Sequence, residues 1–183
     1  MSAELPSDRE RFPNPFASGD LPLRSESWRR ALTQAILDSY GSLDSPNYSF
    51  VMKRYRRPPK DLLRQLGLRG TVEDCTDVNE DVCWRLDIAR VAERVSLLVS
   101  MVGPYSVVLR RMPTGAQVPL TRGTQGLSEL EEFALDALAS SGYDTLSEEE
   151  YKTRIDMNLI DVAPEYRCLY QALFCGEDYF PLH

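Results

Sequence analysis

The sequence contains a single histidine, His183, which is its last residue. A catalytic histidine needs a neighbouring group to orient it and a cleft that tunes its pKa. A chain-end residue in a Pro-containing tail is poorly placed for either requirement. We therefore expect neither a Ser-His-Asp or Cys-His hydrolase nor a histidine-ligated metal site.

Long apolar runs and closely spaced cysteines are also missing. No segment reaches the roughly 18 apolar residues of a membrane span, and the N-terminal residues lack the apolar core of a secretory signal. We expect a cytoplasmic protein without membrane contact. The four cysteines are too far apart for a CxxC redox or zinc motif, so we expect free thiols, no bound metal and no cofactor. They are Cys75, Cys83, Cys168 and Cys175.

Acidic residues outnumber basic residues, and the charge is unevenly distributed along the chain. The 183 residues carry a net charge of −7, with +6 over residues 53–70 and −10 over residues 127–183. A pI near 4.8 argues against nucleic-acid binding, and the acidic C-terminal third favours a basic partner. For the basic stretch we favour neutralisation of the acidic third or plain surface, and nucleic acid or an acidic partner remain as alternatives.

The stretch from Arg94 to Met112 forms the centre of the expected fold. Its Val-, Leu- and Tyr-rich residues alternate in two runs that meet at Gly103-Pro104, which predicts an antiparallel hairpin. Residues 82–88 alternate in the same way and add a third strand. We predict an α+β fold, with an antiparallel sheet that forms a meander around this hairpin and helices packed on one face.

Capping signals predict the helices. Ser25 or Ser27 begins one that ends at Gly41, and residues 61–66 form a helical turn or two before Gly67. Ser128 with Glu131 and Ser147 with Glu150 have capping-box spacing; the first helix ends near Gly142 and the second near Arg154.

The remaining segments have weaker patterns. We predict a short strand over residues 48–55, an acidic loop over 73–81 and a loop over 113–126. Residues 166–174 fit a strand or a helix, and we favour an edge strand. Residues 1–24 hold four prolines and read as an extended arm, laid over the domain or mobile, so that residues 25–183 form the single domain.

Paired carboxylates are numerous, and most have a structural interpretation. Asp77, Asn79 and Asp81 have the spacing that opens a calcium loop, but Val82 and Ile88 replace its glycine and its bidentate Glu. The acids at helix starts complement the helix dipole. We therefore predict no catalytic residue and no metal ligand, and we name the acids as candidate partner contacts. These are Glu73, Asp74, Asp77, Glu80, Asp81, Glu129, Glu132, Glu148 and Glu149.

The central VSMVGPY run and the YQALF run near the C-terminus resemble packing patterns of small acidic bacterial immunity proteins of polymorphic toxin systems. The resemblance covers residues 82–112 and 166–175. It implies a protein that binds a cognate basic toxin domain and occludes its active site with carboxylates. It transfers no individual residue role.

Two other functions remain open. The chain could be an accessory subunit of a larger assembly, with residues 1–24 inserted into a neighbour. It could also be an enzyme that uses carboxylates or a cysteine such as Cys75, which would require a pocket lined by acids or a thiol with a lowered pKa. Of the three, we favour the interaction protein. The sequence does not indicate its oligomeric state.

Overall fold

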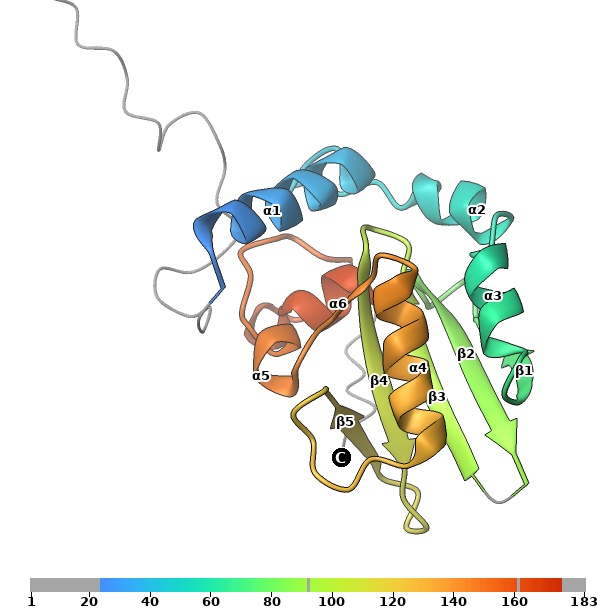
Figure 1. Ribbon diagram of the computed structural model, residues 1–183. Helices are drawn as coiled ribbons and strands as arrows, with labels where there is room; N and C mark the ends of the chain where they lie inside the picture. Colours follow the sequence, from blue (N-terminus) through green and yellow to red (C-terminus); the bar gives the residue numbers. More distant parts are fainter. Residues whose placement is uncertain (1–23, 92, 161, 176–183) are drawn as a thin grey trace, which may run out of the picture.

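The computed structural model describes residues 24–91, 93–160 and 162–175 (Figure 1). Within them the chain forms α-helices, a mostly antiparallel sheet and one short 3-10 helix at Pro164–Tyr166. The helices are α1 (Glu26–Tyr40), α2 (Ser49–Tyr55), α3 (Lys60–Leu66), α4 (Glu129–Ser140), α5 (Glu148–Tyr151) and α6 (Leu169–Leu173). The strands are β1 (Thr71–Asp74), β2 (Cys83–Arg90), β3 (Glu93–Ser100), β4 (Tyr105–Arg111), β5 (Gln117–Leu120) and β6 (Asp144–Thr145).

The sheet follows the order of the chain. Strands β1 to β5 are neighbours in sequence and pair antiparallel, and β6 adds a short parallel pairing with β4. The predicted hairpin is β3 and β4, with Val95 opposite Arg110 and Val99 opposite Ser106. The α+β class and the antiparallel meander around this hairpin are thus confirmed.

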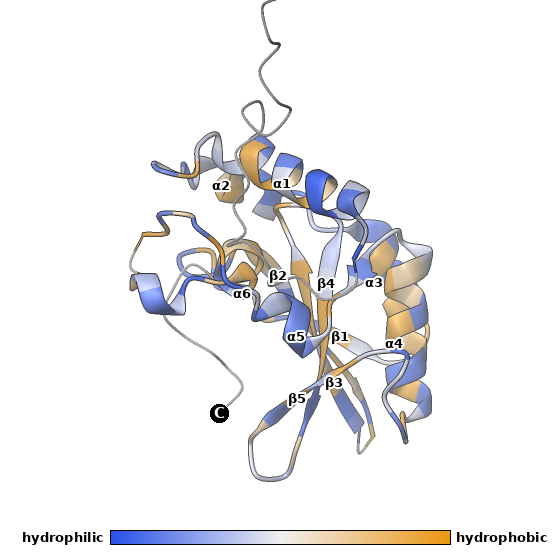
Figure 2. Ribbon diagram, turned by 90° about the vertical axis from the view of Figure 1, so that its left-hand side faces the viewer, coloured by the Kyte–Doolittle hydropathy of each residue, from blue (hydrophilic) through white to orange (hydrophobic). Residues whose placement is uncertain are grey.

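Helices lie on both sides of the sheet, whereas the sequence analysis expected them on one (Figure 2). Arg110 binds Glu131 of α4, and the register gives it the same face as Val95 and Ile88. Odd-numbered residues of β2 point to the opposite face, where Cys83 interacts with Tyr170 of α6. Two covered faces explain why the last six residues of β3 are all buried.

The two best-signalled helices form as predicted. The Ser25 hydroxyl accepts a hydrogen bond from the Trp28 N–H at the start of α1, and Gly41 ends it with a φ of 76°. At α4, Ser128 and Glu131 make the reciprocal bonds of a capping box. These ends depend on contacts within four residues, which is why the sequence reveals them.

Residues 48–55 form helix α2 rather than a strand. Phe50, Val51 and Arg54 face inward, and positions i, i+1 and i+4 fall within the stripe of about 100° that an amphipathic helix buries. Met52, which an alternating strand would bury with Phe50, is 52% exposed. The Pro58-Pro59 pair separates α2 from α3, as expected for residues that interrupt regular hydrogen bonding.

Residues 169–173 form helix α6, so the favoured strand was wrong. Every residue from Cys168 to Cys175 is buried. Because no side of the segment faces solvent, its sequence shows neither a helical nor a strand periodicity clearly. Within the helix, the Gln171 side chain accepts the Cys168 N–H at 3.1 Å. The residues on either side of the helix keep strand-like contacts, because Cys168 forms an isolated bridge to Arg154 and Cys175 forms one to Asp81.

Smaller corrections concern segment ends. The acidic loop begins with strand β1, and the loop over 113–126 contains β5, an edge strand in which Pro119 is tolerated. Helix α5 ends at Tyr151, before the expected Arg154. The predicted arm lies outside the described residues except for Arg24, as does the chain end after Cys175. No described helix is long and apolar enough to cross a membrane.

Candidate functional site

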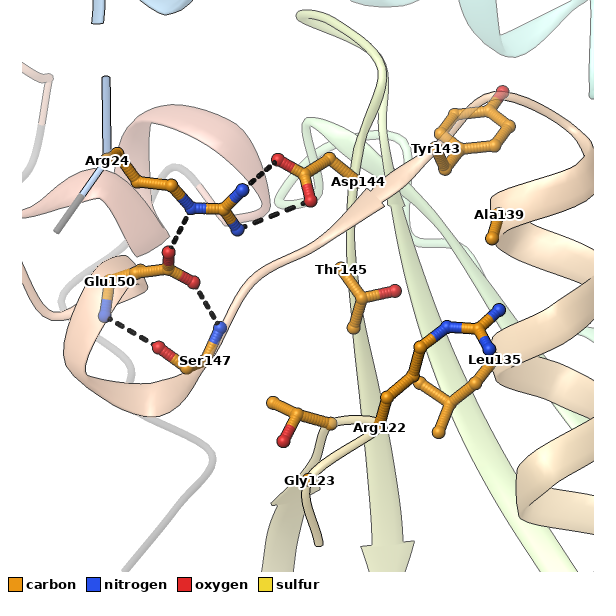
Figure 3. Close-up of a pocket in the computed structure, with 11 residues that line it drawn as sticks. Arg24, Arg122, Gly123, Leu135, Ala139, Tyr143, Asp144, Thr145, Ser147 and Glu150 are labelled. Carbon is orange, nitrogen blue, oxygen red and sulfur yellow. Dashed lines mark hydrogen bonds and ion pairs between the residues drawn. The ribbon is translucent and has the colours of Figure 1, made fainter. Parts of the chain in front are cut away.

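A pocket of about 490 Å³ opens between α4, α5, β6 and the loop that follows β5 (Figure 3). Arg24 and Glu150 lie at one side, and Arg122 lies at the other beside Leu135. Charged side chains from several elements line it, so the first question is whether these groups are available to a ligand.

Arg24 is already engaged by two carboxylates. Its guanidinium binds Asp144 at 3.0 and 3.3 Å and also binds Glu150. The Trp28 indole N–H donates to the same Asp144 at 2.7 Å, and the Arg24 guanidinium lies 5.0 Å from the Trp28 ring centroid. Across the pocket, Arg122 is paired with Asp136 at 2.8 Å.

The electrostatics of Glu150 follow from these contacts. Burial by itself raises the pKa of this carboxyl, but hydrogen bonds from Arg24 and from the Ser147 backbone outweigh it and lower the pKa overall. Glu150 is therefore a fixed carboxylate that ties the start of α1 to α5. The charged groups of the pocket hold elements of the fold together, and the lowered pKa of Glu150 is opposite to the shift that a general acid needs. Sequence reasoning missed this network because Arg24 and Asp144 are 120 residues apart.

The predicted contact Asp81 is an internal anchor. Its side chain is 3% exposed and binds the Arg85 guanidinium at 2.8 and 3.3 Å. It also accepts the Asp77 N–H at 3.0 Å. A buried carboxylate that accepts from three donors cannot contact a partner in this conformation. We therefore remove Asp81 from the candidate partner contacts.

Around this anchor, residues 73–80 form what we call the acidic loop. Asp74 accepts the N–H and the hydroxyl of Thr76, and Asp77 accepts the Asn79 N–H at 2.9 Å. The Thr76 hydroxyl in turn accepts the Arg85 N–H at 2.9 Å. These side-chain bonds fix the loop backbone, while the carboxylates of Asp74 and Asp77 belong to exposed residues.

The other two acids of the loop are exposed as well. Glu73 pairs with Arg94 at 2.9 Å, on the strand part of the loop, and Glu80 precedes the Asp81 anchor. The loop therefore presents four acidic residues from one short, internally bonded segment that begins at the β1 edge of the sheet.

The remaining candidate acids lie at two other places. Glu129 and Glu132 are exposed at the start of α4, where Glu129 is 3.6 Å from Arg90. Glu148 and Glu149 open α5, and Glu148 pairs with Lys152. Figure 1 shows β1, α4 and α5 as separate parts of the molecule. The nine predicted residues thus do not form one surface, and the acidic loop is the only place where four of them adjoin in the described chain.

Three of the thiols, Cys75, Cys83 and Cys168, have raised pKa values, which is opposite to the shift that activates a nucleophile. Burial raises the pKa of Cys168 to about 11 and that of Cys83 well above its usual value. The exposed Cys75 also has a raised pKa, through partial burial and the nearby carboxylates of Asp87 and Glu73. All four cysteines are free thiols in the structure. Over the described residues, no group of three or more His, Cys, Asp or Glu is placed to hold a metal ion.

Among the described residues, the seven cations of residues 53–69 form no ion pair with an acid of the acidic third. Among described residues their only ion pair is local, between Arg64 and Asp61 at 3.1 Å. Arg54 points inward to the Ser39 hydroxyl and the carbonyls of Met101 and Val102. The described ion pairs thus give no support to self-neutralisation, one half of the interpretation favoured from sequence.

Comparisons with protein-family models, with curated proteins and with solved structures gave no match. Function is therefore argued from the surfaces and sites of this chain.

Proposed function

We propose that this chain is a non-catalytic interaction protein that binds a basic protein partner through its acidic loop, residues 73–80. The observation that carries the proposal is the preformed state of that loop. Asp81 and Arg85 anchor it from inside, and local hydrogen bonds fix its backbone. A loop that is ordered before binding loses less conformational entropy in the complex, so more of the contact energy appears as affinity.

The electrostatics of the described groups support binding over chemistry. The shifted carboxyls, Glu131 and Glu150, have lowered pKa values because arginines bind them. A general acid at neutral pH requires the opposite shift, and a thiol nucleophile requires a lowered pKa rather than the raised values of Cys75, Cys83 and Cys168.

The most specific partner we propose is a toxin domain with a basic active-site cleft, for which this chain acts as the immunity protein. Carboxylates on a rigid loop suit such a cleft, because opposite charge speeds the encounter and disfavours wrong partners. The acidic loop bears Glu73, Asp74, Asp77 and Glu80 on exposed positions, and Glu73 pairs with Arg94.

The test is a calorimetric titration against the basic domain encoded by the gene next to this one. Asp74→Lys with Asp77→Lys reverses the centre of the acidic loop and is expected to weaken binding by about tenfold or more. The matched control, Asp156→Lys with Glu165→Lys, makes the same change of charge at exposed positions elsewhere. We expect the control to keep the affinity within about threefold.

Equal effects of the two double variants would show that only net charge matters and would reject the acidic loop as the contact. Strong binding that survives the reversal of Asp74 and Asp77 would do the same. Absence of binding to the neighbouring domain would reject the immunity role.

A further inference from the structure

Helices α2 and α3 carry a second charged surface, of the opposite sign, which the proposed function does not use. Lys53, Arg56, Arg57 and Lys60 are exposed, and within the described residues no acid pairs with them. Figure 1 shows the two helices together at one corner of the molecule, beside the end of the sheet. We call this corner the basic helical surface.

The surface also has apolar members. Met52 is 52% exposed and lies one turn before Arg56, and Leu68 is 76% exposed at the end of the row Lys60, Arg64, Leu68. Residues four apart share one side of a helical segment. An exposed apolar side chain therefore lies among the cations of α2, and another lies in the turn directly after α3.

The helices are held rigidly from below. The Arg54 guanidinium joins α2 to the Ser39 hydroxyl of α1 and to the β3–β4 turn, and it lies 5.2 Å from the Phe50 ring centroid. In α3, Leu62 and Leu66 are at most 1% exposed. The outward cations are thus presented by fixed backbones, as a docking surface requires.

From this arrangement we infer that the basic helical surface docks an acidic protein segment that also carries apolar side chains. The charges of Lys53, Arg56, Arg57 and Lys60 select carboxylates, and Met52 and Leu68 offer contacts to its apolar groups. The interaction is independent of the acidic loop.

A protein segment fits better than an extended phosphate polymer or a lipid surface. Residues 53–70 carry +6 in a chain of −7, so the rest of the molecule carries −13. A long polyanion or a charged bilayer would extend beyond the patch. Its charges would then come within the screening length, about 8 Å at physiological salt, of the negatively charged remainder and would be repelled. The basic helical surface also lacks an exposed aromatic ring for stacking on bases, since Tyr55 is half-buried.

The experiment measures anisotropy of labelled probes with the full chain at low and at physiological salt. The probes are a 12-residue peptide of alternating Glu and Leu, an all-Glu peptide of the same length and a 12-nucleotide single-stranded RNA; vesicles containing phosphatidylserine are tested by co-sedimentation. We expect the Glu-Leu peptide to bind most tightly and to weaken as salt is added.

Charge reversal locates the binding. Arg56→Glu with Arg57→Glu is expected to weaken binding of the Glu-Leu peptide about tenfold or more. The control Arg30→Glu with Arg111→Glu changes net charge equally at two exposed positions outside the surface. We expect its affinity for the Glu-Leu peptide to stay within about threefold of that of the original chain. Replacing Leu68 by Ser is expected to reduce the preference for Glu-Leu over all-Glu.

Other results overturn the inference. Tighter binding to RNA or to vesicles than to the Glu-Leu peptide would assign the surface to phosphates. Failure of the Glu-Leu peptide to bind, or equal losses in the two double variants, would show that the surface docks no acidic segment. Circular dichroism of each variant separates loss of binding from loss of folding.

Discussion

Half-buried arginines act as cross-links between distant parts of this chain. Arg54 joins α2 to the hairpin turn, Arg85 holds the acidic loop, and Arg110 joins β4 to Glu131 of α4. Arg24 joins the start of α1 to Asp144 and Glu150. A guanidinium has five donors in a planar fork, so it can satisfy several oxygens where a lysine would satisfy fewer.

Replacing Arg54 by Met tests one such cross-link. The change removes the Arg54 donor from the Met101 carbonyl, whereas the Val102 carbonyl keeps the Ser39 hydroxyl at 3.1 Å. We expect it to lower the free energy of unfolding by about 1 to 3 kcal/mol. Urea denaturation measures this. The matched change Arg56→Met, at an exposed neighbour, should shift it by less than about 0.5 kcal/mol; similar losses at both positions would contradict the cross-link.

Replacing Asp81 by Asn tests the anchor of the acidic loop. The half-buried Arg85 guanidinium would lose its charge partner, and we expect a cost of about 2 to 4 kcal/mol in unfolding free energy. Asp77→Asn, at an exposed residue of the same loop, serves as control and should cost less than about 1 kcal/mol. An Asp81 variant as stable as the Asp77 variant would show that the ion pair does not hold the loop.

At the scale of elements, local signals and long-range contacts set different boundaries. The capping boxes at Ser128 and Ser147 were readable in the sequence because their partners lie three residues away. The alternation of β2, β3 and β4 was readable because a strand has a fixed period. Helix α6 was not readable, since burial on all sides removes the contrast between its faces.

The candidate site shows the same division. The acidic residues of the loop could be named from composition, but the inward direction of Asp81 depends on Arg85 and on the packing beneath α6. The Arg24 network depends on contacts across 120 residues and leaves no periodic trace in the sequence. Sequence reasoning thus located the loop and could not sort its residues into anchor and contacts.

The two capping boxes make a prediction about acid stability. The hydrogen bonds from Arg110 and from the Ser128 backbone outweigh burial and lower the pKa of Glu131 below its ordinary 4.5, and Glu150 is lowered in the same way. The unfolded chain then takes up protons at a higher pH than the folded chain. This stabilisation is complete above about pH 4.5 and is lost as pH falls through the folded-state values.

The measurement is the free energy of unfolding between pH 7 and pH 3. We expect Glu131→Gln with Glu150→Gln to reduce the loss of stability on acidification, at the cost of lower stability at pH 7. Glu132→Gln, an exposed position in the same first turn as Glu131, is the control. If the free energy of unfolding of the double variant fell with pH as steeply as that of the original chain, Glu131 and Glu150 would not be the source of the acid sensitivity.

The turn after β2 stores strain at Val91. This residue has a φ of 46° and a fully exposed side chain, and β-branched residues rarely adopt that conformation. Val91→Asn should raise the unfolding free energy by about 1 kcal/mol, or the melting temperature by about 2 to 4 °C. Val118→Asn, at a partly exposed strand position without positive φ, should give no gain; an equal rise in both would mean that polarity and not backbone strain is responsible.

At the scale of the whole molecule, charge is separated into regions of opposite sign. The acidic loop begins at the β1 edge, and the basic helical surface occupies α2 and α3. Among the described residues no ion pair joins the two regions. A molecule arranged in this way can engage partners of opposite character at separate places, and each contact should weaken with salt.

The most direct test of the central claim is hydrogen exchange of the chain alone and in complex with the proposed basic partner. We predict that binding protects the backbone amides of the acidic loop, from Glu73 to Glu80, more than any other segment. Protection confined to other segments, with exchange in the acidic loop unchanged, would contradict the account.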